Sequence, residues 1–144
     1  MGTWKNVVVG IDGSEESRHA LAWAVEEARA HGSNLTVVTA WSPPVALLGP
    51  GYAAYPEHAE SDFGAAMRSE QDAAVDAVLG ADPDLEVQRL LVEGSAAPHL
   101  IKASADADLV VVGCRGRGAF AGMLLGSVSQ HVTAHAACPV VVVR

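Results

Sequence analysis

The sequence predicts an α/β fold of the three-layer, open, doubly wound type, in which a five-stranded parallel sheet lies between two layers of helices. Five apolar runs rich in β-branched residues are separated by segments whose apolar residues recur at helical spacing. Regular alternation of strand and helix indicates parallel strands joined by right-handed crossovers. The 144 residues are enough for one such domain, which we expect to span residues 1–144.

The first half of the chain begins with a buried strand and a capped helix. Residues 5–11 (KNVVVGI) form a nearly continuous β-branched run, which is typical of a strand covered on both faces. Ser14 is a favourable N-cap, two glutamates follow it in the first turn, and Gly32 is a natural residue to end the helix. Residues 34–41 (NLTVVTAW) are predicted to form the second buried strand.

Residues 42–62 interrupt this order with a long segment that holds four prolines and both tyrosines. The segment is too long and too rich in proline for an ordinary connection between a strand and a helix. We favour a surface excursion, and a flap over a nearby ligand is the alternative. Helical spacing returns from about residue 62 to residue 79.

The second half repeats the alternation of strand and helix. Residues 85–94 at first alternate apolar and polar side chains, which indicates a less covered strand or an edge strand. A short helix follows, with Ser95 as its N-cap and Pro98 in its first turn. Residues 108–113 are predicted to form the fourth strand, residues 127–137 the last helix, and residues 138–144 the last strand.

Composition and charge exclude several classes of partner. The formal net charge is −8, which argues against the basic surface that nucleic-acid binding needs. No apolar stretch reaches the ~18 residues of a membrane span, and the first residues do not resemble a signal peptide. Two cysteines, Cys114 and Cys138, fit reduced thiols rather than a disulfide framework. We therefore expect a cytoplasmic protein without a nucleic-acid or membrane partner.

The predicted topology also indicates where a ligand would bind. In doubly wound sheets, ligands bind beyond the carboxyl ends of the strands, where the direction of winding reverses. With the strand order 3-2-1-4-5, that point lies between the first and fourth strands. The residues that follow these strands are Gly10-Ile11-Asp12 and the glycine-rich segment that begins at Gly113. Glycines allow a close approach of backbone to ligand and positive φ angles, so their amides can cradle an anion.

Neither common nucleotide-binding motif is present in this segment. A Walker A loop requires a lysine before Ser or Thr, but no lysine follows Lys102. The turn after the first strand (GIDGSEE) lacks the third glycine of the dinucleotide-binding fingerprint. The pattern that is present is Gly113-x2-Gly116-x9-Gly126-Ser127, and its last two residues stand where a helix is predicted to begin. A helix start adds unpaired amides and the positive end of the helix dipole.

With this pattern, the chain resembles the ATP-binding branch of the universal stress protein (UspA-like) family, which carries G-x2-G-x9-G-[ST]. The resemblance spans essentially the whole chain, including the opening VVVGIDGSEES, the central GSAAPHLIKASADADLVVVGCRGRG and the closing GSVSQHVTAHAACPVVVVR. It implies an adenine nucleotide alpha hydrolase-like fold, ATP as the ligand and a role in the stress response. It also implies a homodimer, for which the C-terminal strand from Pro139 to Arg144 is the expected interface, because an apolar edge strand is an aggregation hazard when left unpaired.

The resemblance implies a role for each matching position. Asp12 would contact the ribose or the triphosphate and could hold Mg²⁺. Ala40 would present its backbone to the adenine edge, and Val112 would line the adenosine side with Gly113. Arg115 could help to neutralise the triphosphate. The predicted ATP-binding residues are Gly10, Ile11, Asp12, Ala40, Val112, Gly113, Arg115, Gly116, Gly126, Ser127, Val128 and Ser129.

Several functional alternatives stay open at this point. The first hypothesis is a nucleotide-dependent sensor or regulator that binds ATP. A nucleotide-free adaptor dimer with a vestigial site and a cAMP-binding relative are the alternatives. Enzyme status is undecided, because nothing in the spacing demands more than slow ATP hydrolysis or autophosphorylation at Ser127 or Ser129.

Each candidate residue also has a simpler structural interpretation. Asp12 could merely turn the chain, since Asp-Gly is a common turn pair. Ser127 could be an N-cap, a role compatible with phosphate binding. For Arg117 we favour a solvated loop charge. For the pair His131 and His135, four residues apart on one helix, we favour a solvated face over a metal site.

Overall fold

A computed structural model describes residues 3–42, 59–81, 84–117, 120 and 122–144. Most of the excursion predicted for residues 42–62 therefore lies outside the described residues, and so does Gly118 of the glycine-rich segment. The described elements alternate between strand and helix from one end of the chain to the other. Among the residues that the structure describes, no helix combines the length and the apolar character that a membrane span requires.

The five strands form one parallel sheet in the predicted order. The order is β3-β2-β1-β4-β5, and each neighbouring pair is parallel, which confirms the doubly wound fold. β3 lies at one edge, as its alternating sequence predicts, and β5 lies at the other. The strand bounds are β1 (Asn6–Gly10), β2 (Asn34–Trp41), β3 (Val87–Glu93), β4 (Leu109–Gly113) and β5 (Val140–Val143).

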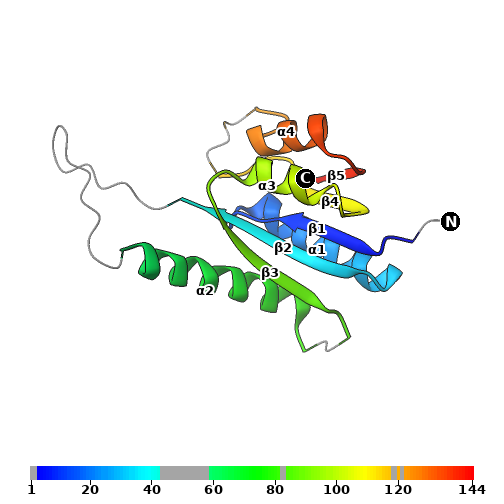
Figure 1. Cartoon of the computed structure of the whole chain (residues 1–144), viewed down its shortest axis with the longest axis horizontal. Coiled ribbons are helices and arrows are strands. Elements are labelled where there is room, and N and C mark those ends of the chain that lie inside the picture. The colour runs from blue at the N-terminus through cyan, green and yellow to red at the C-terminus, as the bar shows by residue number, and fades with distance from the viewer. Residues whose placement is uncertain (1–2, 43–58, 82–83, 118–119, 121) are drawn as a thin grey trace.

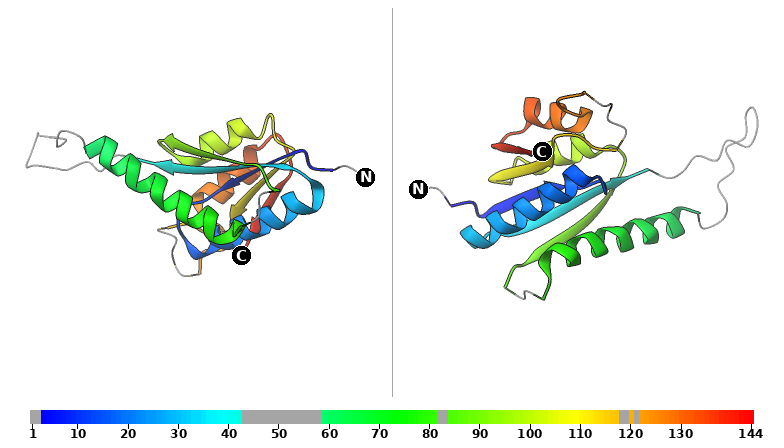
Figure 2. Two further views of the ribbon diagram at one scale, coloured as in Figure 1. Left: turned by 90° about the horizontal axis from the view of Figure 1, so that it is seen from below. Right: turned by 180° about the vertical axis from the view of Figure 1, so that it is seen from behind.

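Two helices cover each face of the sheet. Figures 1 and 2 show two helices, α1 and α2, on one side of the strands and the other two, α3 and α4, on the opposite side. This division follows from the topology, because right-handed crossovers on either side of the switch point place their helices on opposite faces. The helix bounds are α1 (Glu15–His31), α2 (Ala59–Leu79), α3 (Ala96–Ala103) and α4 (Ser127–His135).

The continuous valine runs are explained by burial on both faces. Val7 and Val9 point into the core beneath α1 and α2, whereas Val8 points into the second core beneath α3 and α4. β4 follows the same alternation, with Val111 on the first face and Val110 on the second. Because successive side chains of a strand point to opposite faces, a strand with no solvent-exposed face shows no polar alternation.

The predicted helix ends are largely borne out. Ser14 is the N-cap of α1 and accepts a hydrogen bond of 3.2 Å from the amide of Ser17, and Gly32 ends the helix at a φ of 64°. The start of α4 was predicted correctly, whereas the start of α2 and the end of α4 were not. α2 begins at Ala59 rather than near residue 62, and α4 begins at Ser127 as predicted but ends at His135 rather than at residue 137. The N-cap of α4 is Gly126, so the alternative interpretation of Ser127 as the N-cap was wrong.

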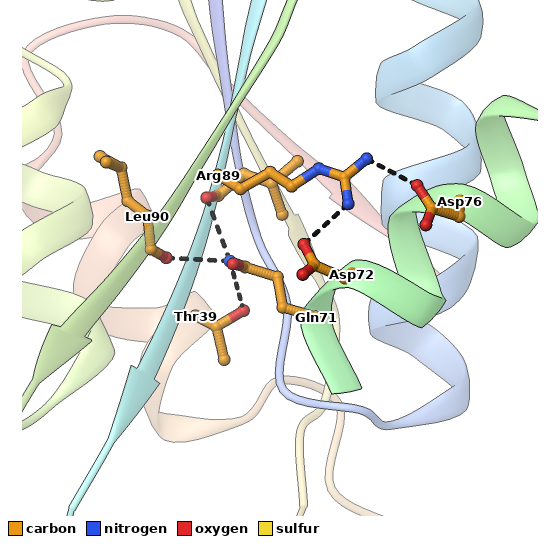
Figure 3. A network of polar contacts seen from close by, with 7 residues as sticks. Thr39, Gln71, Asp72, Asp76, Arg89 and Leu90 are labelled. Carbon is orange, nitrogen blue, oxygen red and sulfur yellow. Dashed lines mark hydrogen bonds and ion pairs between the residues drawn. The ribbon is translucent and has the colours of Figure 1, made fainter. Parts of the chain in front are cut away.

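α2 is joined to the sheet by a buried amide and an ion-pair group (Figure 3). The Nε2 of Gln71 donates to the hydroxyl of Thr39 at 3.0 Å and to the carbonyl of Leu90 at 2.9 Å, with a longer contact of 3.4 Å to the carbonyl of Val37. Its Oε1 is buried and has no partner among the described residues. Beside it, Arg89 of β3 pairs with Asp72 at 2.8 Å and Asp76 at 2.7 Å. This side of the sheet is therefore held by polar contacts as well as by the apolar core.

Candidate functional site

A pocket lies at the point where the winding of the sheet reverses. β1 and β4 are neighbours at the centre of the sheet, with Val7 beside Leu109 and Val9 beside Val111. A pocket of about 320 Å³ opens beyond their carboxyl ends, a volume within the range of small-molecule sites. It is lined by Gly10, Ile11, Asp12, Ser17, Ala96, Leu100, Val112, Gly113, Arg115, Gly116, Arg117, Phe120, Met123, Gly126, Ser127, Val128 and Ser129.

The structure brings together all of the predicted binding residues except Ala40. Segments that are far apart in sequence, beginning at Gly10, Val112 and Gly126, line the same pocket. Ala40 belongs to β2, where it is half-buried and pairs with Val92 of β3 rather than lining the pocket. The expected backbone contact of Ala40 with adenine stays a prediction.

Asp12 connects the two loops that form the mouth of the pocket. Its Oδ1 accepts a hydrogen bond of 2.9 Å from the amide of Ser14, and its Oδ2 accepts one of 2.8 Å from the amide of Arg117. Partial burial alone would raise the pKa of Asp12, but hydrogen bonds from Ser14, Arg117 and Ser17 outweigh it and lower the pKa below its ordinary value. Asp12 is therefore an anion that joins the two loops of the site. It does more than turn the chain, which was the alternative interpretation.

Cys114 shapes the glycine-rich loop through its backbone. Its amide donates to the carbonyl of Val143 at 2.7 Å, and its carbonyl accepts from the amide of Gly126 at 2.7 Å. The hydroxyl of Ser129 donates to the same carbonyl at 2.9 Å. The start of the loop is thus tied both to β5 and to the first turn of α4.

Two glycines of the motif are required for close packing rather than for an unusual backbone angle. A Cβ at Gly113 would lie 2.9 Å from the backbone carbon of Glu16, and a Cβ at Gly116 would collide with Oδ2 of Asp12. Neither residue has a positive φ angle. The expectation that the loop glycines adopt positive φ is borne out for Gly122, at 91°, and is wrong for these two.

The first turn of α4 presents backbone amides to the pocket. Gly126 caps the helix, and the first amide bonded within it is that of Gln130, which donates to the carbonyl of Gly126 at 3.0 Å. The amides of the first three helical residues have no partner inside the helix, and they form the positive end of the helix dipole. Ser127 is exposed, whereas the hydroxyl of Ser129 is buried and already donates to backbone carbonyls. This turn suits an anion.

Both arginines at the mouth of the pocket are paired with carboxylates. Arg115 contacts Glu16 of α1 at 3.1 Å, and Arg117 contacts Glu70 of α2 at 2.8 Å. The pairs join the loop after β4 to the two helices on the far face of the sheet. Arg117 is a solvated loop charge as favoured, with 62% of its side chain exposed, but it also pairs with Glu70 and lines the pocket.

Part of the apolar lining of the pocket comes from residues that sequence reasoning did not select. Ala96 and Leu100 of α3 line it together with Phe120 and Met123 of the loop. Leu100 also contacts the backbone of β1 so closely that a Cβ at Gly10 would lie 2.8 Å from its side chain. The available signal was the i, i+4 spacing of Ala96 and Leu100 on a helix predicted to follow β3, but only the fold shows which way that face points.

The described residues contain no preformed metal centre. No group of three or more His, Cys, Asp or Glu side chains gathers within the described part of the chain. His131 and His135 are exposed, with ring centroids 6.5 Å apart, and the Nδ1 of His131 lies 2.8 Å from the carbonyl of Ser127. Asp12 is the carboxylate at the pocket that a nucleotide-bound Mg²⁺ could use, because Mg²⁺ retains several waters and needs few protein ligands.

These features define a class of protein: a doubly wound α/β domain with a pocket of small-molecule size at the switch point, lined by apolar side chains and by the first turn of a helix. The sequence profile of the universal stress protein family matches residues 3–144. The chain belongs to the universal stress protein family.

Individual relatives agree with this assignment. A universal stress protein of Mycobacterium bovis is 41% identical over 140 residues, which are 96% of this chain and 45% of that protein. The chain thus spans about half the length of this relative. A universal stress protein of Thermus aquaticus is 37% identical over 143 residues, covering 98% of this chain and 99% of that protein. A universal stress protein solved in complex with cAMP has a TM-score of 0.74 and 28% identity, covering 99% of this chain and 98% of that one.

Proposed function

We propose that the protein binds ATP in this pocket and acts as a nucleotide-dependent sensor or regulator in the stress response. The observation that carries the proposal is the placement of the Gly113-x2-Gly116-x9-Gly126-Ser127 pattern at the pocket. The closely packed glycines and the unpaired amides at the start of α4 lie together beyond the carboxyl ends of the strands, where a doubly wound sheet binds its ligands. A cytoplasmic location stays a prediction from the sequence.

The chemistry of the pocket lining suits an adenine nucleotide. Ile11, Leu100 and Val112 offer apolar surface for a flat base, and Met123 and Phe120 stand near it. The start of α4, which lines the same pocket, offers backbone amides that suit phosphate oxygens. An elongated ligand with an apolar head and an anionic tail matches this distribution.

Mg²⁺ would bind together with the nucleotide rather than in a site of its own. One carboxylate, Asp12, stands at the pocket, and both of its oxygens already accept backbone hydrogen bonds. The remaining lone pairs allow one direct or water-mediated contact with a phosphate-bound ion. Asp12 would therefore orient the ion, and the nucleotide phosphates would supply most of the binding.

Binding has stronger support than catalysis. Rapid phosphoryl transfer requires a positioned base or water-orienting group and strong stabilisation of charge on the terminal phosphate. The loop lacks a Walker A lysine, and both arginines at the mouth are engaged by carboxylates. We therefore propose regulation through nucleotide occupancy, with slow hydrolysis or autophosphorylation left to direct assay.

A second candidate ligand is cAMP, which the cyclic-nucleotide complex of a structural relative favours. A cyclic nucleotide keeps the adenine and one phosphate but carries less negative charge than ATP. The apolar lining would serve both ligands equally, so the phosphate end must distinguish them. Competition between ATP and cAMP for the purified protein separates the two candidates.

We also propose that the protein forms a homodimer through the strand from Pro139 to Arg144. β5 is an edge strand that pairs with β4 on one side. The carbonyls of Pro139 and Val143 accept from β4, so the alternate residues Val140 and Val142 direct their backbone groups away from the sheet. Leu124 is 86% exposed and lines a second hollow together with Val142 and Arg144, which adds apolar surface beside this edge.

Two measurements test the nucleotide proposal. Calorimetry with Mg-ATP should give saturable heat, and acid extraction of the purified protein followed by chromatography should identify any retained nucleotide. Absence of heat together with an unchanged melting temperature at millimolar ATP would overturn ATP binding. Saturable binding of cAMP without competition from ATP would make cAMP, rather than ATP, the ligand. If neither nucleotide binds, the nucleotide-free adaptor dimer is the alternative that is left.

A further inference from the structure

The backbone and the side chain of Arg117 serve different partners at the mouth of the pocket. The amide of Arg117 donates to Asp12 at 2.8 Å, which fixes its backbone beside the loop after β1. Its guanidinium extends to α2, where Nη2 lies 2.8 Å from Oε1 of Glu70. The backbone position is thus set by the pocket, whereas the direction of the positive charge is set by Glu70.

The ion pair between Arg117 and Glu70 crosses directly over Gly13, in the turn after β1. Gly13 has a φ of 82°, and a Cβ there would collide with Nη2 of Arg117 and lie 2.7 Å from Oε1 of Glu70. Both charged groups therefore lie against the turn that leads from Asp12 to α1. The pair is part of the entrance to the pocket, and α2 contributes to the site through Glu70 although Glu70 does not line the pocket.

Glu70 changes the charge that an incoming anion meets. Arg117 is neutralised by Glu70 and Arg115 by Glu16, while Asp12 adds a further negative charge at the same mouth. A phosphate group gains full attraction from Arg117 only if it replaces the carboxylate of Glu70. The energy of this attraction grows with the charge of the ligand, so its loss matters most for a triphosphate and least for a monophosphate.

We propose that Glu70 sets the charge selectivity of the pocket: by holding Arg117 across Gly13, it weakens the binding of polyphosphates relative to monophosphates. The inference rests on the proposed nucleotide site. Glu70 acts through Arg117 and is a positioning residue. Both side chains are largely exposed, at 47% and 62%, so the effect is modest and falls as salt increases.

The test compares the affinities of ATP, AMP and inorganic tripolyphosphate for wild-type protein, Glu70→Gln, Arg117→Gln and the double variant. Glu70→Gln should tighten ATP and tripolyphosphate binding by about two- to fivefold in low salt, the range expected for release of an exposed ion pair, and leave AMP nearly unchanged. The gain should be absent when Arg117 is already replaced, because the two residues act as one unit. Raising the ionic strength to about 0.15 M should reduce the gain.

Asp76→Asn is the matched control. It removes the same charge from the same helix, but Asp76 contacts Arg89 of β3 and does not reach the pocket. It should leave the ATP-to-AMP affinity ratio at the wild-type value. Glu70→Ala removes the carboxylate with a different side chain and should reproduce Glu70→Gln, with melting temperatures confirming that each variant is folded.

Different outcomes would overturn the role of Glu70 and the proposed nucleotide binding. If the wild-type protein binds ATP but Glu70→Gln has the same ATP-to-AMP affinity ratio as the wild type, the role of Glu70 is overturned and the proposed function is unaffected. An equal gain for AMP and ATP, or a gain that persists without Arg117, also overturns the role of Glu70. A wild-type protein that binds none of the three ligands overturns the proposed function and the inference with it.

Discussion

The carboxylate of Asp12 accepts a hydrogen bond of 2.8 Å from the backbone amide of Arg117, a residue 105 positions further along the chain. The other carboxylate oxygen accepts from the amide of Ser14 at 2.9 Å. A single side chain therefore joins the loop after β1 to the loop after β4. The shape of the pocket mouth depends on this bridge before any ligand binds.

Replacing Asp12 with Asn should destabilise the fold even without ligand. The amide oxygen of Asn can accept from one of the two backbone amides, while its NH₂ group would face the other donor. We expect the free energy of unfolding to fall by about 1 kcal/mol in urea titrations, since the lost bond involves a charged acceptor at a partly exposed site. Asp106→Asn, at an exposed position, should cost much less. Equal losses for the two variants would contradict the bridging role.

The contribution of Asp12 should also depend on pH in a defined direction. Burial raises its pKa, but the hydrogen bonds outweigh burial and lower it below the ordinary 3.8. A carboxylate with a lowered folded-state pKa stabilises the fold above its unfolded-state pKa and loses this contribution as the pH falls through the folded-state value. The stability difference between wild type and Asp12→Asn should be constant near neutral pH and shrink below about pH 4. A difference that grows on acidification would reverse the assigned sign.

Gly126→Ala should weaken nucleotide binding while leaving the fold intact. Gly126 has an ordinary φ of −75°, and an added Cβ would lie 3.4 Å from Arg115 Cα, a tight contact that small shifts can relieve. The methyl group would stand at the start of α4, where we expect phosphate to approach, so we predict about a tenfold loss of ATP affinity by calorimetry, or about 1.4 kcal/mol. Gly64→Ala on α2 is the control, because its Cβ meets Trp41 at 3.8 Å and it does not line the pocket. Unchanged affinity in Gly126→Ala would count against phosphate binding at α4.

Replacing Gln71 with Met should destabilise the fold although one atom of the amide is unpaired. The Met side chain would remove the donor to Thr39 and to the carbonyl of Leu90, and it would also remove the orphan Oε1. We expect a net loss of about 1 kcal/mol by urea unfolding, because these two acceptors and the more distant carbonyl of Val37 lose their donor, while one unpaired acceptor is removed. Gln88→Met, on the exposed side of β3, should be nearly neutral. A more stable Gln71→Met would mean that the orphan oxygen costs more than the donor contributes.

Val142→Pro should convert the proposed homodimer to a monomer. Proline removes the amide of Val142, which points away from β4, and edge strands tolerate proline where the missing N–H faces outward. Val142→Thr keeps the amide and should remain dimeric. Sedimentation velocity would measure both species, and circular dichroism would confirm that both are folded. A proline variant that stays dimeric would place the interface elsewhere.

Much of the fold was predictable because its signals are local. The valine run from Val7 to Val9 and the run in β4 lack polar alternation, which indicates strands buried on both faces. Ser14 and Gly32 mark the ends of α1 through the chemistry of single residues. Because alternating strands and helices permit few topologies, the strand order and the switch point could be predicted. The position of the glycine-rich loop could then be predicted from the switch point.

The details of the site were decided by tertiary packing. Glu70 reaches Arg117 across 47 positions, and Leu100 lines a pocket with Ile11 only because α3 lies on the face opposite α1. By itself, then, the sequence determined the order of elements, the glycine pattern and the end of the sheet at which a ligand would bind. The structure alone decided which charges are neutralised and which apolar side chains face the pocket. The reason is physical: propensities and caps act over a few residues, whereas ion pairs and pocket walls depend on how distant elements pack.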